Sequence, residues 1–143
     1  MNIRDILHHK GEDVFSVGPG EDATSVARAL AQHRIGAALV RDQSGHVLGI
    51  ISERDIVRAV AREGALALAR TARDLMTADL VTATPATSIA EGLAVMTDRR
   101  CRHLPVMEGG RLAGMVSIGD LVKARIAEAE LEAENLRAFV TAA

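Results

Sequence analysis

The strongest constraint on the fold is that the chain repeats itself once. A shift of 66 residues places Pro19 on Pro85 and Arg34 on Arg100. After one loop the shift becomes 65, and a longer block matches, in which Gly45, Gly49, Ser52, Asp55 and Val57 fall on Gly110, Gly114, Ser117, Asp120 and Val122. Two copies are too few for a solenoid, which needs three or more repeats. The sequence therefore predicts one pseudo-symmetric pair, with repeat 1 in residues 1–70 and repeat 2 in residues 71–143.

Each repeat shows the same predicted order of elements, namely strand, helix, strand, turn, strand and helix, which is an α+β pattern. Asp22 and Ser88 are good N-caps for the first helix of each repeat, and Glu91 would complete a capping box with Ser88. Strands are expected at residues 14–17, 35–40 and 47–51 in repeat 1 and at residues 80–83, 101–107 and 112–116 in repeat 2. The segments before the repeats match as well, because a shift of 69 places Arg4-Asp5 on Arg73-Asp74.

The chemistry common to both repeats lies in two matched strings, Gly49-Ile-Ile-Ser-Glu-Arg-Asp55 and Gly114-Met-Val-Ser-Ile-Gly-Asp120. Each string places a hydroxyl and a carboxylate three residues apart where a strand gives way to a helix. The helix N-terminus suits a phosphate, the serine can donate to a phosphate oxygen, and the carboxylate can accept from both hydroxyls of a ribose. The glycines would let the ring of a ligand approach the backbone closely. Alternatively, Asp55 and Asp120 only cap their helices, a role that duplication would copy equally.

This Gly-x-x-Ser-x-x-Asp pattern, present twice in register, resembles the signature of the CBS domain family. The run from Arg102 to Val106 is similar to the family's His-Arg-Leu-Pro-Val strand. The resemblance covers essentially the whole chain and points to a stand-alone, bacterial-type CBS pair (a Bateman module). It implies two tandem βαββα repeats packed as a pseudo-two-fold intramolecular sandwich with two clefts, here with an extended C-terminal helix. Family ligands are mostly AMP, ADP and ATP, and in some members NAD(H) or S-adenosylmethionine.

The resemblance also implies which residues line the clefts, since each cleft of a related pair combines the Ser–Asp motif of one repeat with the first long strand of the other. One cleft would use Ser117, Asp120, Met115, Arg102 and His103 with Ile35 and Gly36. The other would use Ser52, Arg54, Asp55, Ile50 and Ala37 with Cys101 and Arg102. The two clefts differ, because Arg54 offers a second phosphate contact where repeat 2 has Gly119.

Composition excludes several classes of function. The net charge of −2 and the pI near 6.2 give no basic surface for nucleic acid, and a chain with two Phe and no Trp or Tyr has no platform for stacking bases. The single cysteine, Cys101, forms no internal disulfide and fits a reducing compartment. The N-terminal residues do not resemble a signal peptide, and no apolar run is long enough to cross a bilayer. We expect a cytoplasmic protein that binds neither nucleic acid nor membrane and carries no metal and no cofactor.

Other polar residues suggest ordinary structural roles. His8 and His9 are adjacent, so on a helix their side chains diverge by about 100° and do not share a metal. Cys101 and His103 could form a nucleophile and its base, but no orienting group accompanies them, and a core role is expected for Cys101. Lys10 beside Gly11 could meet a phosphate, although an exposed helix end is the default.

The last helix is longer than a repeat requires and carries an apolar stripe at spacings of four and three residues, made of Val122, Ile126, Ala129, Ala133, Leu136 and Val140. Because the two alanines make the stripe thin, packing on a neighbouring repeat or on a second subunit is as well supported by the pattern as a free coiled coil. We expect a homodimer.

The leading hypothesis is a non-catalytic sensor that binds AMP, ADP, ATP or NAD(H) between its repeats. Because no effector domain fits in 143 residues, the sensor would act on an unknown effector protein in trans or through oligomerisation. A second class is a structural dimerisation module with empty or vestigial clefts. An enzyme is a third class, for which the sequence offers no catalytic constellation.

Overall fold

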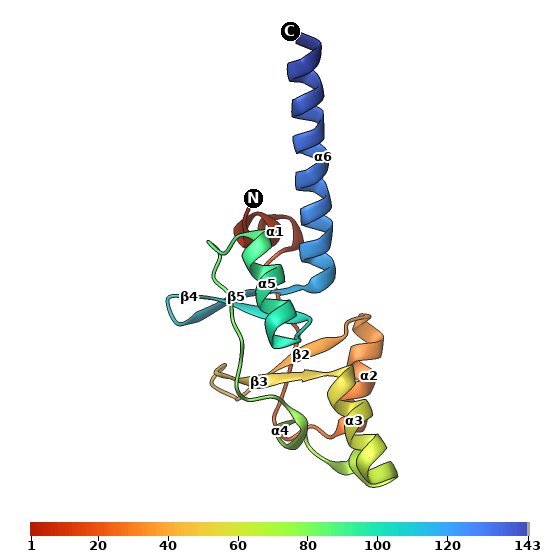
Figure 1. The fold of residues 1–143 in the computed structure, drawn as a ribbon. Helices are drawn as coiled ribbons and strands as arrows, with labels where there is room; N and C mark the ends of the chain where they lie inside the picture. The colour runs from red at the N-terminus through yellow and green to blue at the C-terminus, as the bar shows by residue number, and fades with distance from the viewer. Residues whose placement is uncertain (143) are drawn as a thin grey trace. The chain divides into compact units, whose positions relative to one another are not determined.

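The computed structural model describes residues 1–142, which fold into two compact units (Figure 1). Unit 2 is the continuous segment Asp13–Leu80, whereas unit 1 joins Met1–Glu12 to the residues from Val81 onward. The units therefore do not coincide with the expected halves 1–70 and 71–143. The first helix folds with repeat 2, and residues 71–80 fold with repeat 1, because the segment before each repeat packs in the other unit.

Unit 2 is built on a three-stranded sheet in the order β1-β2-β3. The short strand β1 (Ser16–Val17) runs parallel to β2 (Ala37–Arg41), which pairs antiparallel with β3 (Val47–Ser52). Around the sheet lie α2 (Ala23–His33), α3 (Glu53–Glu63), the 3₁₀ segment η1 (Gly64–Ala69) and α4 (Ala72–Leu75). Its core consists of Val17, Val26, Leu30, Ala38, Val40, Ile51, Ile56 and Ala72.

Unit 1 contains the antiparallel pair β4 (His103–Glu108) and β5 (Arg111–Ser117). The helices of this unit are α1 (Ile3–Lys10), α5 (Ile89–Arg99) and α6 (Ile118–Ala142). The helix α1 belongs here because its apolar face, Ile3 and Leu7, is buried in the core of this unit. The remaining buried members of that core are Ala83, Ile89, Met96, Leu104, Val106, Val116, Leu121 and Ala124.

The predicted helix starts are confirmed. The Ser25 N–H donates to Asp22 Oδ1 at 2.8 Å, and the Glu91 N–H donates to Ser88 Oγ at 3.0 Å, so the structure shows the serine half of the expected capping box. Both helices end at the matched arginines Arg34 and Arg100, which have the left-handed φ values of 53° and 52° that often close a helix.

The prediction of a strand at residues 80–83 is wrong in its extent. Of these four residues only Ala83 pairs, in an isolated parallel bridge to Val106. In repeat 1 the Leu39 N–H donates to the Phe15 carbonyl at 3.4 Å, upstream of β1. Repeat 2 has Pro105 in the place of Leu39, and proline has no N–H to donate. The bond that would extend the pairing upstream of Ala83 is therefore missing, and the strand shrinks to one residue.

Both motif glycines lie against the protein itself rather than against open space. A Cβ on Gly49 would come within 2.6 Å of the Thr77 carbonyl oxygen and 2.7 Å of Met76 Sδ. A Cβ on Gly114 would come within 2.7 Å of Leu7 Cδ2. Leu7 and Met76 are equivalent under the shift of 69, so the two contacts are copies of each other. The close approach that the sequence assigned to a ligand ring is made instead by the segment that precedes the other repeat.

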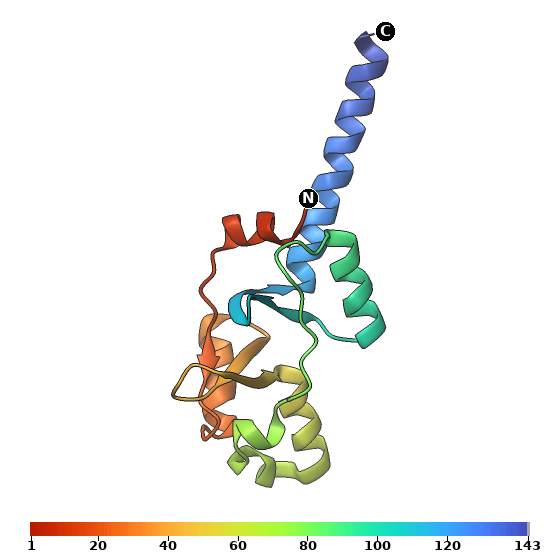
Figure 2. The same ribbon diagram turned by 90° about the vertical axis from the view of Figure 1, so that its left-hand side faces the viewer.

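The C-terminal part of α6 extends beyond the other elements of unit 1 (Figure 2). Only Leu121 and Ala124 of this 25-residue helix are buried. No helix within residues 1–142 is both long and apolar enough to cross a membrane.

Gly49→Ala should destabilise unit 2 by about 1–3 kcal/mol, because the new methyl group would meet a backbone oxygen. Gly114→Ala should cost less, because a leucine side chain can rotate away. Gly20→Ala is the control, since nothing lies within 4 Å of its Cβ position, and its effect should stay within about 0.5 kcal/mol. Urea unfolding followed by circular dichroism measures all three. A Gly49→Ala protein as stable as the wild type would contradict the assigned contact.

Candidate functional site

The Ser–Asp motif occupies the same strand-to-helix junction in both units. In unit 2, β3 ends at Ser52 and α3 follows, and in unit 1, β5 ends at Ser117 and α6 follows. Each serine pairs across the sheet with the first residue of the preceding strand, Ala37 or His103. A further backbone bond closes each junction, since the Glu53 N–H donates to the Gly36 carbonyl at 3.0 Å and the Ile118 N–H donates to the Arg102 carbonyl at 2.8 Å.

Within each junction the serine and the aspartate hold each other by reciprocal bonds. The Ser52 N–H donates to Asp55 Oδ2 at 2.8 Å, and the Asp55 N–H donates to Ser52 Oγ at 3.3 Å. Ser117 and Asp120 make the same two bonds at 2.8 and 3.2 Å. These are capping boxes, so the helix-cap role of the aspartates is confirmed. A carboxylate has about four acceptor sites, so capping does not exclude binding of a ligand.

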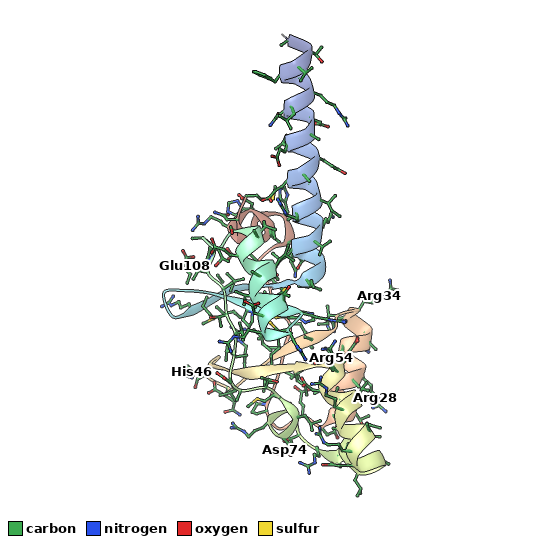
Figure 3. All side chains as sticks on the ribbon, viewed as in Figure 1. Arg28, Arg34, His46, Arg54, Asp74 and Glu108 are labelled. Carbon is green, nitrogen blue, oxygen red and sulfur yellow. The ribbon has the colours of Figure 1, made fainter. Side chains whose placement is uncertain are left out.

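The structure gathers the expected site residues of each repeat at these junctions. In unit 2, Ser52, Asp55, Ile35, Gly36 and Ile50 are half-buried and Ala37 is buried. Arg54, on the first turn of α3, is exposed (Figure 3). In unit 1, half-buried positions are held by Ser117, Asp120, Met115, Cys101 and His103, while Arg102 is exposed.

The two junctions differ in charge because, among residues 1–142, a lysine binds the junction of unit 1 and none binds that of unit 2. Lys10 Nζ lies 2.7 Å from Asp120 Oδ2 and 3.0 Å from the Met115 carbonyl oxygen. Burial alone would raise the pKa of Asp120. The Lys10 ammonium and the Ser117 N–H outweigh burial, and the pKa of this carboxyl lies below its ordinary value. Asp120 is therefore a paired carboxylate at neutral pH.

The sequence analysis did not predict this ion pair, since its partners are 110 residues apart. The shift of 69, which matches the segments before the repeats, gives a partial indication that the two junctions differ in charge. It places Lys10 on Asp79, so the two repeats carry opposite charges at one position. In unit 2 the counterpart of Met115 is Ile50, whose N–H and carbonyl are both bonded to the Thr77 backbone, at 3.0 and 2.8 Å.

Cys101 does not have the properties of an activated nucleophile. Burial raises the pKa of its thiol above the ordinary value, which disfavours the reactive thiolate. Within residues 1–142, no group of three or more His, Cys, Asp and Glu side chains is arranged to hold a metal ion.

A hollow of about 730 Å³ lies elsewhere on unit 2, between the loop of residues 18–21 and the hairpin of residues 41–44. These hairpin residues follow the end of β2 that lies away from Ala37 and its partner Ser52. The hollow is lined by no residue of the Ser–Asp motif, so it is separate from the candidate site.

Comparison with known proteins gives consistent matches. A model of the CBS domain matches residues 3–62 and 72–127. The mitochondrial CBS domain-containing protein CBSX3 of Arabidopsis thaliana is 36% identical over 146 residues, which cover 96% of this chain and 71% of the plant protein. The crystal structure of a CBS-domain containing protein from Agrobacterium tumefaciens has a TM-score of 0.85 and 45% identity, and the match covers 87% of this chain and 92% of that chain.

A more distant structure is a complex with small molecules. It is the CBS domain pair of protein MJ0100 in complex with 5′-methylthioadenosine and S-adenosyl-L-methionine, with a TM-score of 0.78 over 90% of this chain and 98% of that chain. At 22% identity this likeness shows the fold alone.

Proposed function

Because the chain belongs to the CBS domain family, we propose that it is a regulatory module whose Ser–Asp motifs bind adenosine-containing ligands. The observation that carries the proposal is the duplicated junction, in which Asp55 and Asp120 are held in the same geometry at the start of a helix. A fixed carboxylate offers acceptors for ribose hydroxyls, and the positive end of the helix dipole beside it favours a phosphate. The ligands of the MJ0100 domain pair, both adenosine derivatives, support the choice of ligand class.

Within this class we propose AMP, ADP, ATP or NAD(H) as the ligand. The exposed Arg54, next to the motif of unit 2, offers a cationic contact that favours a phosphate-bearing ligand there. The module is proposed to be non-catalytic, since the thiol of Cys101 is kept protonated and a regulatory domain needs only differential binding. The cytoplasmic location and the effector protein in trans stay predictions.

Asp55→Ala and Asp120→Ala should each weaken AMP binding about tenfold or more at the affected site, because each loses a charged acceptor for the ribose. Both variants should also melt earlier, since each loses half of a capping box. Titration calorimetry with AMP measures the affinity, and thermal unfolding measures the stability.

The matched control is Asp22→Ala, which removes the cap of α2 outside the motif. It should melt earlier and bind AMP normally. If Asp55→Ala and Asp120→Ala behave in the same way as this control, the aspartates only cap their helices. The absence of binding of AMP, ADP, ATP and NAD(H) to the wild type would favour the alternative, a structural module.

We also propose that the module is a homodimer that uses the apolar stripe of α6. Four of the six stripe residues are large and lie open to solvent, with exposed fractions of 44% for Val122, 54% for Ile126, 61% for Leu136 and 73% for Val140. A contiguous exposed stripe of this kind is unusual on a monomer and typical of an interface. A two-fold interface would cover it and could pass ligand occupancy on as a change between subunits.

Light scattering at tens of micromolar, a concentration at which a modest interface of this kind should hold, should show a dimer, and Leu136→Glu should shift it to a monomer. Leu131→Glu is the matched control. Leu131 is 56% exposed on the same helix, but by heptad position it lies on the face opposite to the stripe. A monomeric wild type, or equal effects of the two variants, would contradict the proposed interface.

A further inference from the structure

Lys10 donates hydrogen bonds to two acceptors of unit 1 that a bound ligand would also use, the Asp120 carboxylate and the Met115 carbonyl. Lys10 Nζ binds Asp120 Oδ2, the atom that also accepts the Ser117 N–H. It binds the Met115 carbonyl as well, which is a backbone acceptor on the strand that leads to the motif. An ammonium that donates to both groups fills positions suited to hydroxyl and amino donors of a nucleoside.

The helix that carries Lys10 is firmly attached to unit 1. Ile3 is fully buried and Leu7 is 4% exposed, and the Ile3 and Arg4 N–H groups donate to the Thr87 and Pro85 carbonyls at 2.9 Å. The Gly11 N–H closes the helix on the Leu7 carbonyl at 2.8 Å. The backbone of Lys10 is thus fixed beside the junction.

The side chain of Lys10 has more freedom than its backbone. It is 42% exposed, and its four-carbon stem can rotate without disturbing the helix. The ammonium can therefore leave Asp120 while α1 stays in place.

We propose that Lys10 is a built-in competitor for the ribose-binding carboxylate of Asp120, so that a ligand enters the site of unit 1 only by displacing the lysine. The inference rests on the proposed function and adds a determinant of affinity that acts on one of the two motifs. In unit 2 the equivalent position is Asp79, which cannot neutralise Asp55. The ligand therefore meets a paired carboxylate in unit 1, whereas no lysine pairs with Asp55 in the part of the chain that the structure describes.

The test compares Lys10→Met with Lys123→Met in the full chain, using 5′-methylthioadenosine as the probe. This nucleoside has a ribose but no phosphate, so a displaced lysine gains no new anionic partner on the ligand. Lys123 lies exposed on α6 of the same unit, and its replacement makes the same change of charge away from the junction. Calorimetry should show binding to Lys10→Met about two- to fivefold tighter than to the wild type, the range expected from a partly exposed ion pair. Lys123→Met should bind like the wild type.

The salt dependence of binding is a second readout. If Lys10 only supported the fold, the difference in affinity between Lys10→Met and the wild type would not depend on salt. In about 1 M salt, which screens charges over about 3 Å, the difference between Lys10→Met and the wild type should shrink. Equal or weaker binding by Lys10→Met would overturn the inference while leaving the proposed function intact. If the probe, AMP and NAD(H) bind to none of the three proteins, the proposed function fails and the inference fails with it.

Discussion

The arrangement of both units depends on the reciprocal bonds between a serine and an aspartate where a strand becomes a helix. In each unit the serine N–H and the aspartate N–H are both satisfied within the motif. The next N–H is bound to the carbonyl that precedes the paired strand. Two strands and a helix therefore meet at one fixed point. The same motif placed twice in the sequence produces the same local geometry twice.

Capping and ligand binding are compatible roles for this motif. The cap uses one oxygen of the carboxylate as an acceptor. A carboxylate has about four acceptor sites, so others remain for the hydroxyls of a ribose. A cap restricts the rotamer of the aspartate before any ligand arrives, which lowers the entropy lost on binding. In the proposed function the duplicated caps would serve as preorganised acceptors. Their different surroundings, with Lys10 near one and Arg54 near the other, would then give a physical basis for unequal ligand preferences.

Local features of the structure could be predicted from the sequence, and contacts between distant segments could not. The caps at Asp22 and Ser88 and the two Ser–Asp junctions follow from residue types a few positions apart. The loss of the strand at residues 80–83 depends on Pro105, more than twenty residues later, which lacks the N–H that Leu39 supplies in the other repeat. The partners of Gly49 and Gly114, and the pairing of Lys10 with Asp120, depend on the way in which the segment before each repeat packs in the unit of the other. In the sequence, the segments before the repeats differ from the rest only in matching at a shift of 69 instead of 66 or 65. That difference does not indicate in which unit each segment packs.

A crystal structure of the chain grown with AMP tests the central claim most directly. The account predicts electron density for the nucleotide with its ribose hydroxyls on the carboxylate of Asp55 or Asp120, and Lys10 turned away wherever Asp120 is used. AMP bound elsewhere, for example in the hollow between residues 18–21 and 41–44, would contradict the account, as would crystals grown at saturating AMP that contain no nucleotide.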